Sequence, residues 1–131
     1  MNPRAILGMI ALKRQLHPEL GAPLGWHGFQ QILEREQISL RVTRLPRPAQ
    51  LVQYAGNWTI LLDSETNRHL HHGTHELGHL WLHHDLPCER WERVYNTDHW
   101  DGPDPREEEA ELFSALVIAG PRMRRSLNPL R

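Results

Sequence analysis

The residues best suited to chemistry are two histidines four positions apart, in the segment His75-Glu76-Leu77-Gly78-His79. On a helix, positions i and i+4 project from one face, so both imidazoles can reach one metal ion. Glu76 stands beside the first histidine, where its carboxylate can take a proton from a water that the ion activates. The pattern predicts a zinc site with His75 and His79 as metal ligands and Glu76 as the catalytic acid/base.

A catalytic zinc site needs a third protein ligand, and a run of glutamates downstream of the histidines offers one. Glu109 is the favoured ligand because it lies one helical turn before Phe113, at the edge of the expected buried face. Glu107 is assigned to the helix cap, while Glu108 and Glu111 remain alternatives to Glu109. The alternative for the glutamates is a solvated first turn that complements the helix dipole. The alternative for the histidines is an amphipathic helix that carries both of them on its surface.

Most of the ten histidines lie between His69 and His99, around this motif. His83 follows His79 by one helical turn, and we expect it to contact the last carbonyls of the helix rather than the ion. Three histidines before the motif are expected at the surface or as supports of a ligand: His69, His71 and His72. Spacing does not choose among three candidates for stabilising an oxyanion: Tyr54, Tyr95 and His99.

The elements that must position these residues follow from periodicity and from the breaking residues. Two helices are expected first, over residues 3–17 and about 25–37. Three short strands are expected next, over 38–43, 51–54 and 58–62, with Ala55-Gly56-Asn57 as a tight turn. The strand over 51–54 is predicted to be the open edge of the sheet. Together these elements predict an α+β fold with a small three-stranded sheet packed on helices.

The second half of the chain is expected to hold the site. The motif helix should run from about Ser64 to Asp85, followed by a loop over 86–103. A further helix should begin at Asp104-Pro105 and end at Gly120-Pro121. The sequence thus predicts a single domain over residues 1–131, with an N-terminal helix within 1–20 and a basic, mobile tail over 122–131.

Composition narrows the function classes. The 131 residues include 15 Lys+Arg and 16 Asp+Glu, for a net charge of −1, so we expect no direct binding of nucleic acid. The longest apolar run is too short for a bilayer, so no membrane association is expected. The single cysteine fits a reducing compartment, and we expect a cytoplasmic protein.

Two segments together resemble the ImmA/IrrE family of zinc metallopeptidases. The first is Thr74-His75-Glu76-Leu77-Gly78-His79-Leu80-Trp81-Leu82-His83, and the second is Glu109-Ala110-Glu111-Leu112-Phe113-Ser114-Ala115, followed by Pro121. The resemblance covers roughly residues 25 to 121 and implies a zincin-like fold. It also implies zinc (Zn2+) held by His75, His79 and Glu109, with Glu76 as the catalytic acid/base.

The chain departs from this family pattern at two positions: Glu111 stands where the family usually has Asn, and Ser114 where it often has Ala. The size of the chain resembles the short branch of the family that phages and mobile elements encode. That resemblance implies an endopeptidase for a cytoplasmic protein, with a helix-turn-helix transcriptional repressor as the candidate substrate and partner. Two other functions remain open: a zincin-like binding module that acts as an antirepressor by occlusion, and a structural zinc domain.

Overall fold

A computed structural model describes residues 3–83, 93–95 and 105–127 of the chain. The helices are α1 (Pro3–Arg14), the 3-10 helix η1 (Pro18–Gly21), α2 (Trp26–Arg35), α3 (His69–His83), α4 (Pro105–Ala119) and α5 (Pro121–Ser126). The strands are β1 (Ser39–Thr43), β2 (Ala49–Tyr54), β3 (Asn57–Asp63) and β4 (Arg93–Tyr95). The α+β prediction is confirmed, and the motif lies on a helix as its spacing requires.

The sheet has the strand order β1-β3-β2-β4. β1 runs parallel to β3, whereas β2 runs antiparallel to both β3 and β4. Ala55 and Gly56 form the turn between β2 and β3, both with positive φ (51° and 82°), as a two-residue hairpin turn demands. The predicted turn is therefore confirmed, one residue shorter than expected.

β4 changes one prediction about the sheet. It lies within residues 86–103, where the sequence predicts only a loop, and it pairs with residues 51–53 of β2. Val52 faces Thr59 on one side and Val94 on the other, so β2 is an inner strand. The prediction that residues 51–54 form the open edge is wrong. The hydrophobic pattern of three strands gave no sign of this short fourth partner.

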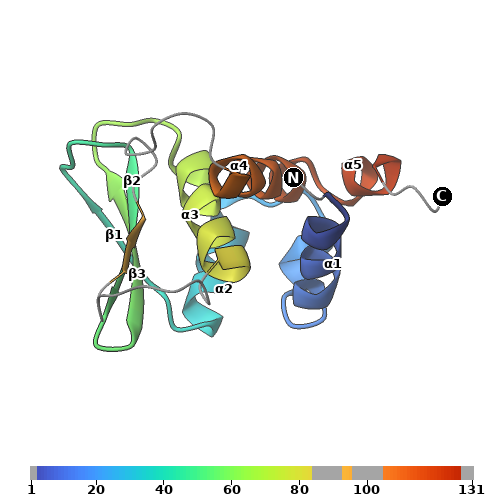
Figure 1. Cartoon of the computed structure of the whole chain (residues 1–131), viewed down its shortest axis with the longest axis horizontal. Coiled ribbons are helices and arrows are strands. Elements are labelled where there is room, and N and C mark those ends of the chain that lie inside the picture. The colour runs from blue at the N-terminus through green and yellow to red at the C-terminus, as the bar shows by residue number, and fades with distance from the viewer. Residues whose placement is uncertain (1–2, 84–92, 96–104, 128–131) are drawn as a thin grey trace.

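Helix α3 lies between the sheet and the other helices, as Figure 1 shows. It contacts β2 and β3 on one side and packs most extensively on α4 on the other. Residues 73–81 of α3 are buried without interruption, so the motif lies in the interior of the described fold. Among the residues that the structure describes, no helix has the length and apolar character that crossing a bilayer requires.

The C-terminal residues differ from the predicted tail. Helix α5 begins at Pro121, directly after Gly120, whose φ of 96° favours glycine. Arg124 is buried, and its guanidinium donates hydrogen bonds to the carbonyls of Leu20 and Leu116. The structure therefore ties residues 121–126 to α4 and η1, while residues 128–131 lie outside the described part.

Gly78 lets α3 and α4 approach closely. A Cβ atom at Gly78 would lie 2.9 Å from Cδ1 of Phe113 and 3.3 Å from Cα of Ala110. The second contact is with backbone, so it cannot be relieved by a side-chain rotation. The glycine between the two motif histidines thus sets the distance between the helices.

We expect Gly78→Ala to lower the free energy of unfolding by about 1–3 kcal/mol, because the new methyl group overpacks the interface between α3 and α4. Thermal unfolding of the purified protein measures the change. Gly8→Ala in α1 is the matched control, since a Cβ there meets nothing within 4 Å. Alanine should stabilise that helix by up to about 1 kcal/mol. A Gly78→Ala protein as stable as Gly8→Ala would contradict the close approach.

Candidate metal centre

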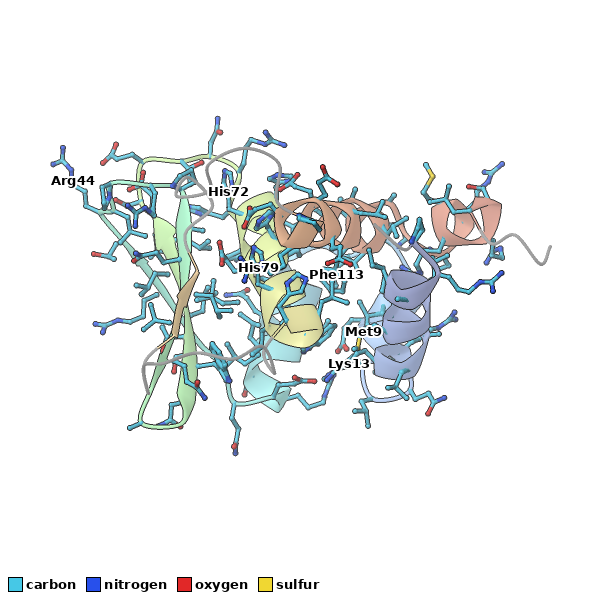
Figure 2. The ribbon with its side chains drawn as sticks, viewed as in Figure 1. Met9, Lys13, Arg44, His72, His79 and Phe113 are labelled. Atoms are coloured by element: carbon cyan, nitrogen blue, oxygen red, sulfur yellow. The ribbon has the colours of Figure 1, made fainter. Side chains whose placement is uncertain are left out.

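The structure brings His75, His79 and Glu107 together at the interface of α3 and α4. One ligand atom from each of the three lies within 4.8 Å of the other two. The Nε2 of His75 lies 3.0 Å from one oxygen of Glu107, and the Nε2 of His79 lies 2.7 Å from the other. Two imidazole nitrogens and a carboxylate thus converge on one point, as the helical spacing of the histidines predicts. Figure 2 marks His79 on α3 and Phe113 on α4.

Glu76 lies beside this cluster and is completely buried, with 0% exposure. Neither of its carboxylate oxygens has a hydrogen-bond partner among the described residues. Burial raises the pKa of Glu76 to about 8, against the opposing charge of His75. An isolated buried carboxyl is costly to the fold, and in a cleft it is typical of a group that transfers protons.

A small cavity of about 150 Å³ gives access to these groups. It is lined by residues of β2, α3 and α4: Ala49, His72, His75, Glu76, Glu107 and Glu111. The cavity therefore joins the candidate base, one candidate ligand histidine and the glutamates of α4 in one enclosed space, which suits a small reacting group or a water.

The charges of the histidines and of Glu107 in the cluster depend on one another. Burial disfavours a charged His75, but hydrogen bonds to Glu107 and Glu111 outweigh it and raise the pKa of His75 to about 9. Burial also disfavours a charged Glu107, yet hydrogen bonds to His75 and His79 hold its pKa far below the ordinary value. Burial lowers the pKa of His79. The pocket thus holds a carboxylate that stays ionised and that binds positive charge.

The glutamate that lies against both histidines is not the one predicted from the sequence. Glu107, which was assigned to the cap, contacts both histidines, whereas the carboxylate of Glu109 lies 3.0 Å from Nε2 of His83. The physical reason is the face of α4 that packs on α3. Ala110 and Ser114 are buried there, and Glu107 lies three positions before Ala110 on the same side. Glu109 is rotated by roughly 200° from Glu107 around the helix. Glu108 is exposed.

The outer nitrogens of both cluster histidines also have partners. The Nδ1 of His75 lies 2.5 Å from a carboxylate oxygen of Glu111, which also lies 3.3 Å from Nε2 of His71. The Nδ1 of His79 lies 3.1 Å from Nδ1 of His83. His83 therefore turns toward His79 and Glu109, and the expectation that it contacts the last carbonyls of the helix is wrong. The departure from Asn at Glu111 places a carboxylate directly against a cluster histidine.

Ser114, the other departure from the family pattern, links the two helices. Its hydroxyl lies 2.5 Å from Oγ1 of Thr74, and one of the two hydroxyls donates to the other. The hydroxyl that keeps its proton donates to a carbonyl of α3, which is His71 at 3.2 Å for Ser114 or Leu70 at 2.8 Å for Thr74. These bonds satisfy two buried hydroxyls one residue away from the motif, so Ser114 helps to set the position of α3 against α4.

The other sequence-based candidates are distributed as follows. His69 bonds the carbonyl of Asp63 at the start of α3, and His72 lines the cavity. The side chains of Tyr54 and Tyr95 and the whole of His99 lie outside the described part of the chain. The same holds for the proposed cap residue Asp104.

The donor set fits a catalytic metal. Two imidazole nitrogens and one carboxylate oxygen form a three-ligand set typical of catalytic zinc, which leaves a coordination position for water or substrate. The buried Glu76 and the adjoining cavity lie beside this donor set. Metal binding by His75, His79 and Glu107 stays a prediction, but their arrangement is what such an ion requires.

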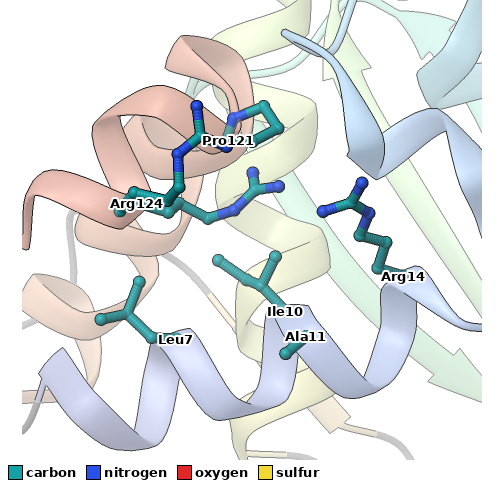
Figure 3. A pocket seen from close by; sticks show the side chains of 7 residues that line it. Leu7, Ile10, Ala11, Arg14, Pro121 and Arg124 are labelled. Atoms are coloured by element: carbon teal, nitrogen blue, oxygen red, sulfur yellow. The ribbon is translucent and has the colours of Figure 1, made fainter. Parts of the chain in front are cut away.

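A larger hollow of about 410 Å³ lies elsewhere, between α1 and α5. Figure 3 shows Leu7, Ile10 and Arg14 of α1 opposite Pro121 and Arg124. It contains no histidine and no carboxylate among its lining residues, so it lacks both a proton-transfer group and a metal-ligand set. The smaller cavity beside the histidines is therefore the candidate reaction site.

Comparison with known proteins agrees with this assignment. A family model described as the IrrE N-terminal-like domain, Peptidase_M78, matches residues 34–131, which is more than half of the chain. The match includes α3 and α4, and hence every residue of the cluster. Comparison with curated proteins gives no match.

We expect Glu107→Gln to weaken zinc binding by about a thousandfold or more, because the amide that replaces the carboxylate is neutral and a poor ligand. Glu109→Gln should keep zinc affinity within about tenfold, since the carboxylate of Glu109 contacts His83, which lies outside the three-residue cluster. Competition with a chromogenic chelator measures both affinities. Loss of zinc in Glu109→Gln with normal binding in Glu107→Gln would restore the sequence-based assignment.

Proposed function

Because this chain belongs to the IrrE N-terminal-like, Peptidase_M78 family, a family of metallopeptidases, we propose that it is a zinc-dependent endopeptidase. The proposal depends on one observation above all: His75, His79 and Glu107 converge beside the buried carboxylate of Glu76, which has no hydrogen-bond partner in the described part of the chain. His75, His79 and Glu107 would hold the ion, and Glu76 would be the catalytic acid/base.

Zinc held by these three residues would supply Lewis acidity, which polarises a peptide carbonyl and makes a nearby water more acidic. Glu76 supplies the proton transfers. As a carboxylate it accepts a proton from the attacking water, and the protonated carboxyl then donates to the leaving amine. Its burial raises its pKa above the ordinary value of a carboxyl group, which makes the carboxylate a stronger proton acceptor.

The arrangement favours an enzyme over a structural zinc domain. A structural zinc site is closed by four protein ligands, whereas the described residues bring three ligand side chains together next to a cavity. A structural site also gives no reason to bury Glu76 where no described residue offers its carboxylate a hydrogen bond. A binding module that acts by occlusion has no need of that carboxylate either.

The proposed substrate is a cytoplasmic protein, with a helix-turn-helix repressor as the candidate. The support is the resemblance to the short, phage-type branch of the family. An extended substrate segment can pair with a free sheet edge, which in the described sheet belongs to β1 or β4 rather than to β2. Backbone pairing of this kind selects exposed or flexible segments over compact folded proteins.

We expect Glu76→Gln to reduce turnover of dye-labelled casein by about 10²–10⁴-fold, because the amide cannot accept the proton from water. The zinc affinity of the variant should change little, since Glu76 is not among the three converging ligands. Metal analysis and a fluorescence assay on the same preparation separate the two effects.

The result also discriminates between the functions. Normal cleavage by Glu76→Gln would contradict the proposed role of Glu76. Absence of cleavage by the unaltered, zinc-loaded chain, together with tight binding of a repressor, would favour the antirepressor that acts by occlusion. Zinc that stays bound but leaves no position for an inhibitor such as a hydroxamate would favour a structural domain.

A further inference from the structure

Four histidines of α3 form a row along the helix at intervals of four residues: His71, His75, His79 and His83. The row faces the glutamates in the first two turns of α4, and each of the four imidazoles lies within 3.3 Å of a carboxylate oxygen. Only the two middle members belong to the proposed metal centre. The outer pair and two of the glutamates have no part in the function proposed so far.

The first support acts on His75. A carboxylate can only accept a hydrogen bond, so the Nδ1 of His75, 2.5 Å from Glu111, carries a proton and donates it. The Nε2 of His75 lies 3.0 Å from Glu107 and carries the other proton while no ion is bound. An ion held by Nε2 and Glu107 would replace that proton and leave the one on Nδ1 in place. His71 contacts the same oxygen of Glu111 at 3.3 Å and helps to hold this half-exposed carboxylate in place.

The second support acts on His79 through an intermediate residue. The Nε2 of His83 lies 3.0 Å from Glu109 and donates to it, which leaves Nδ1 of a neutral His83 as an acceptor. That Nδ1 lies 3.1 Å from Nδ1 of His79. When Nε2 of His79 binds an ion, the remaining proton of the ring must lie on Nδ1, from where it donates to His83.

We propose that Glu111, and Glu109 through His83, are positioning residues that hold the two metal-binding imidazoles by their outer nitrogens. Both supports have the same consequence: they turn the Nε2 atoms of His75 and His79 toward the two oxygens of Glu107, so that an ion could bind among the three residues. This inference rests on the proposed metal centre, and it gives a purpose to Glu109, Glu111 and His83 that direct ligation does not.

Glu111 contacts its histidine directly, whereas Glu109 reaches His79 through His83, and this difference can be tested. Glu111 and His83 act on different histidines, so their effects on zinc affinity are independent and multiply. Glu109 acts only through His83, so the two lie in series, and removing both costs no more than removing His83. A purely electrostatic role of the glutamates predicts another result, because each lost negative charge would weaken zinc binding separately.

The experiment measures zinc dissociation constants of the full chain by chelator competition. Glu111→Ala and His83→Phe should each weaken binding by about 10–100-fold, and the double variant by the product of the two losses. Glu109→Ala should weaken binding by at most about tenfold, and His83→Phe/Glu109→Ala should match His83→Phe alone. Glu111→Gln should recover most of the lost affinity, because its amide oxygen still accepts the proton of Nδ1.

Glu108→Ala is the matched control, since it removes the same charge from an exposed position on the same turn of α4. Imidazole ¹⁵N spectra of the zinc-loaded protein add a readout that a merely structural role would not change. They should show slowly exchanging protons on Nδ1 of His75 and His79. The exchange should become fast at His75 in Glu111→Ala and at His79 in His83→Phe.

The outcomes separate this inference from the proposed function. Zinc affinities of Glu111→Ala and His83→Phe that equal that of Glu108→Ala would overturn the supports and leave the metal centre intact. A multiplied loss in His83→Phe/Glu109→Ala would overturn the series arrangement. An unaltered chain that binds no zinc would overturn the metal centre and the supports together.

Discussion

The close packing of α3 on α4 is the contact on which the rest of the site depends. The histidines come from one helix and the glutamates from the other, so a shift of either helix would separate ligand from ligand. Gly78 permits the approach because nothing larger fits against Phe113 and the backbone of Ala110. The hydroxyl pair of Thr74 and Ser114 fixes the two helices at a second place along the same interface. The motif is therefore a packing motif as well as a chemical one.

The sheet serves this interface from the other side. β2 and β3 cover the face of α3 that turns away from α4, so the buried residues of the motif helix are enclosed between two layers. That enclosure buries Glu76 and raises its pKa. A carboxylate that costs stability when buried becomes useful only if a reaction needs it. The fold thus carries an energetic penalty at the position where chemistry is proposed.

Much of this arrangement could be predicted from the sequence, since it depends on local periodicity. The i, i+4 spacing placed His75 and His79 on one helical face, and the period-two strands and the turn at Gly56 were recognisable from residue type. The choice between Glu107 and Glu109 was not local. It depends on the rotation of α4 about its own axis, which Ala110 and Ser114 set by packing on α3. The apolar residues of this helix, Ala110, Phe113 and Val117 among them, indicated its buried side but not which part of that side packs on α3.

The role of His83 escaped prediction for a related reason. A histidine in the last turn of a helix has a ready explanation in the helix dipole, and only the position of Glu109 on another helix reveals a different partner. β4 was not predicted because a segment of three residues is too short to show the alternating pattern of a strand. In both cases the missing information was which segment, distant in the sequence, packs against the residue or strand.

Charge balance explains why three glutamates surround the row of histidines. A metal ligand must present a lone pair, and an imidazole does so reliably only when its other nitrogen has an acceptor. In the family pattern an Asn at the position of Glu111 would offer a neutral acceptor, whereas the carboxylate of Glu111 also raises the basicity of His75. A more basic imidazole binds a cation more strongly, but it also binds protons more strongly, so ion and proton compete for the same nitrogen. Glu107 strengthens this competition, since its ionised carboxylate attracts both the metal ion and the proton. Compared with a neutral Asn, the carboxylate of Glu111 would favour tighter retention of an ion, at the expense of a higher affinity for protons when the ion is absent.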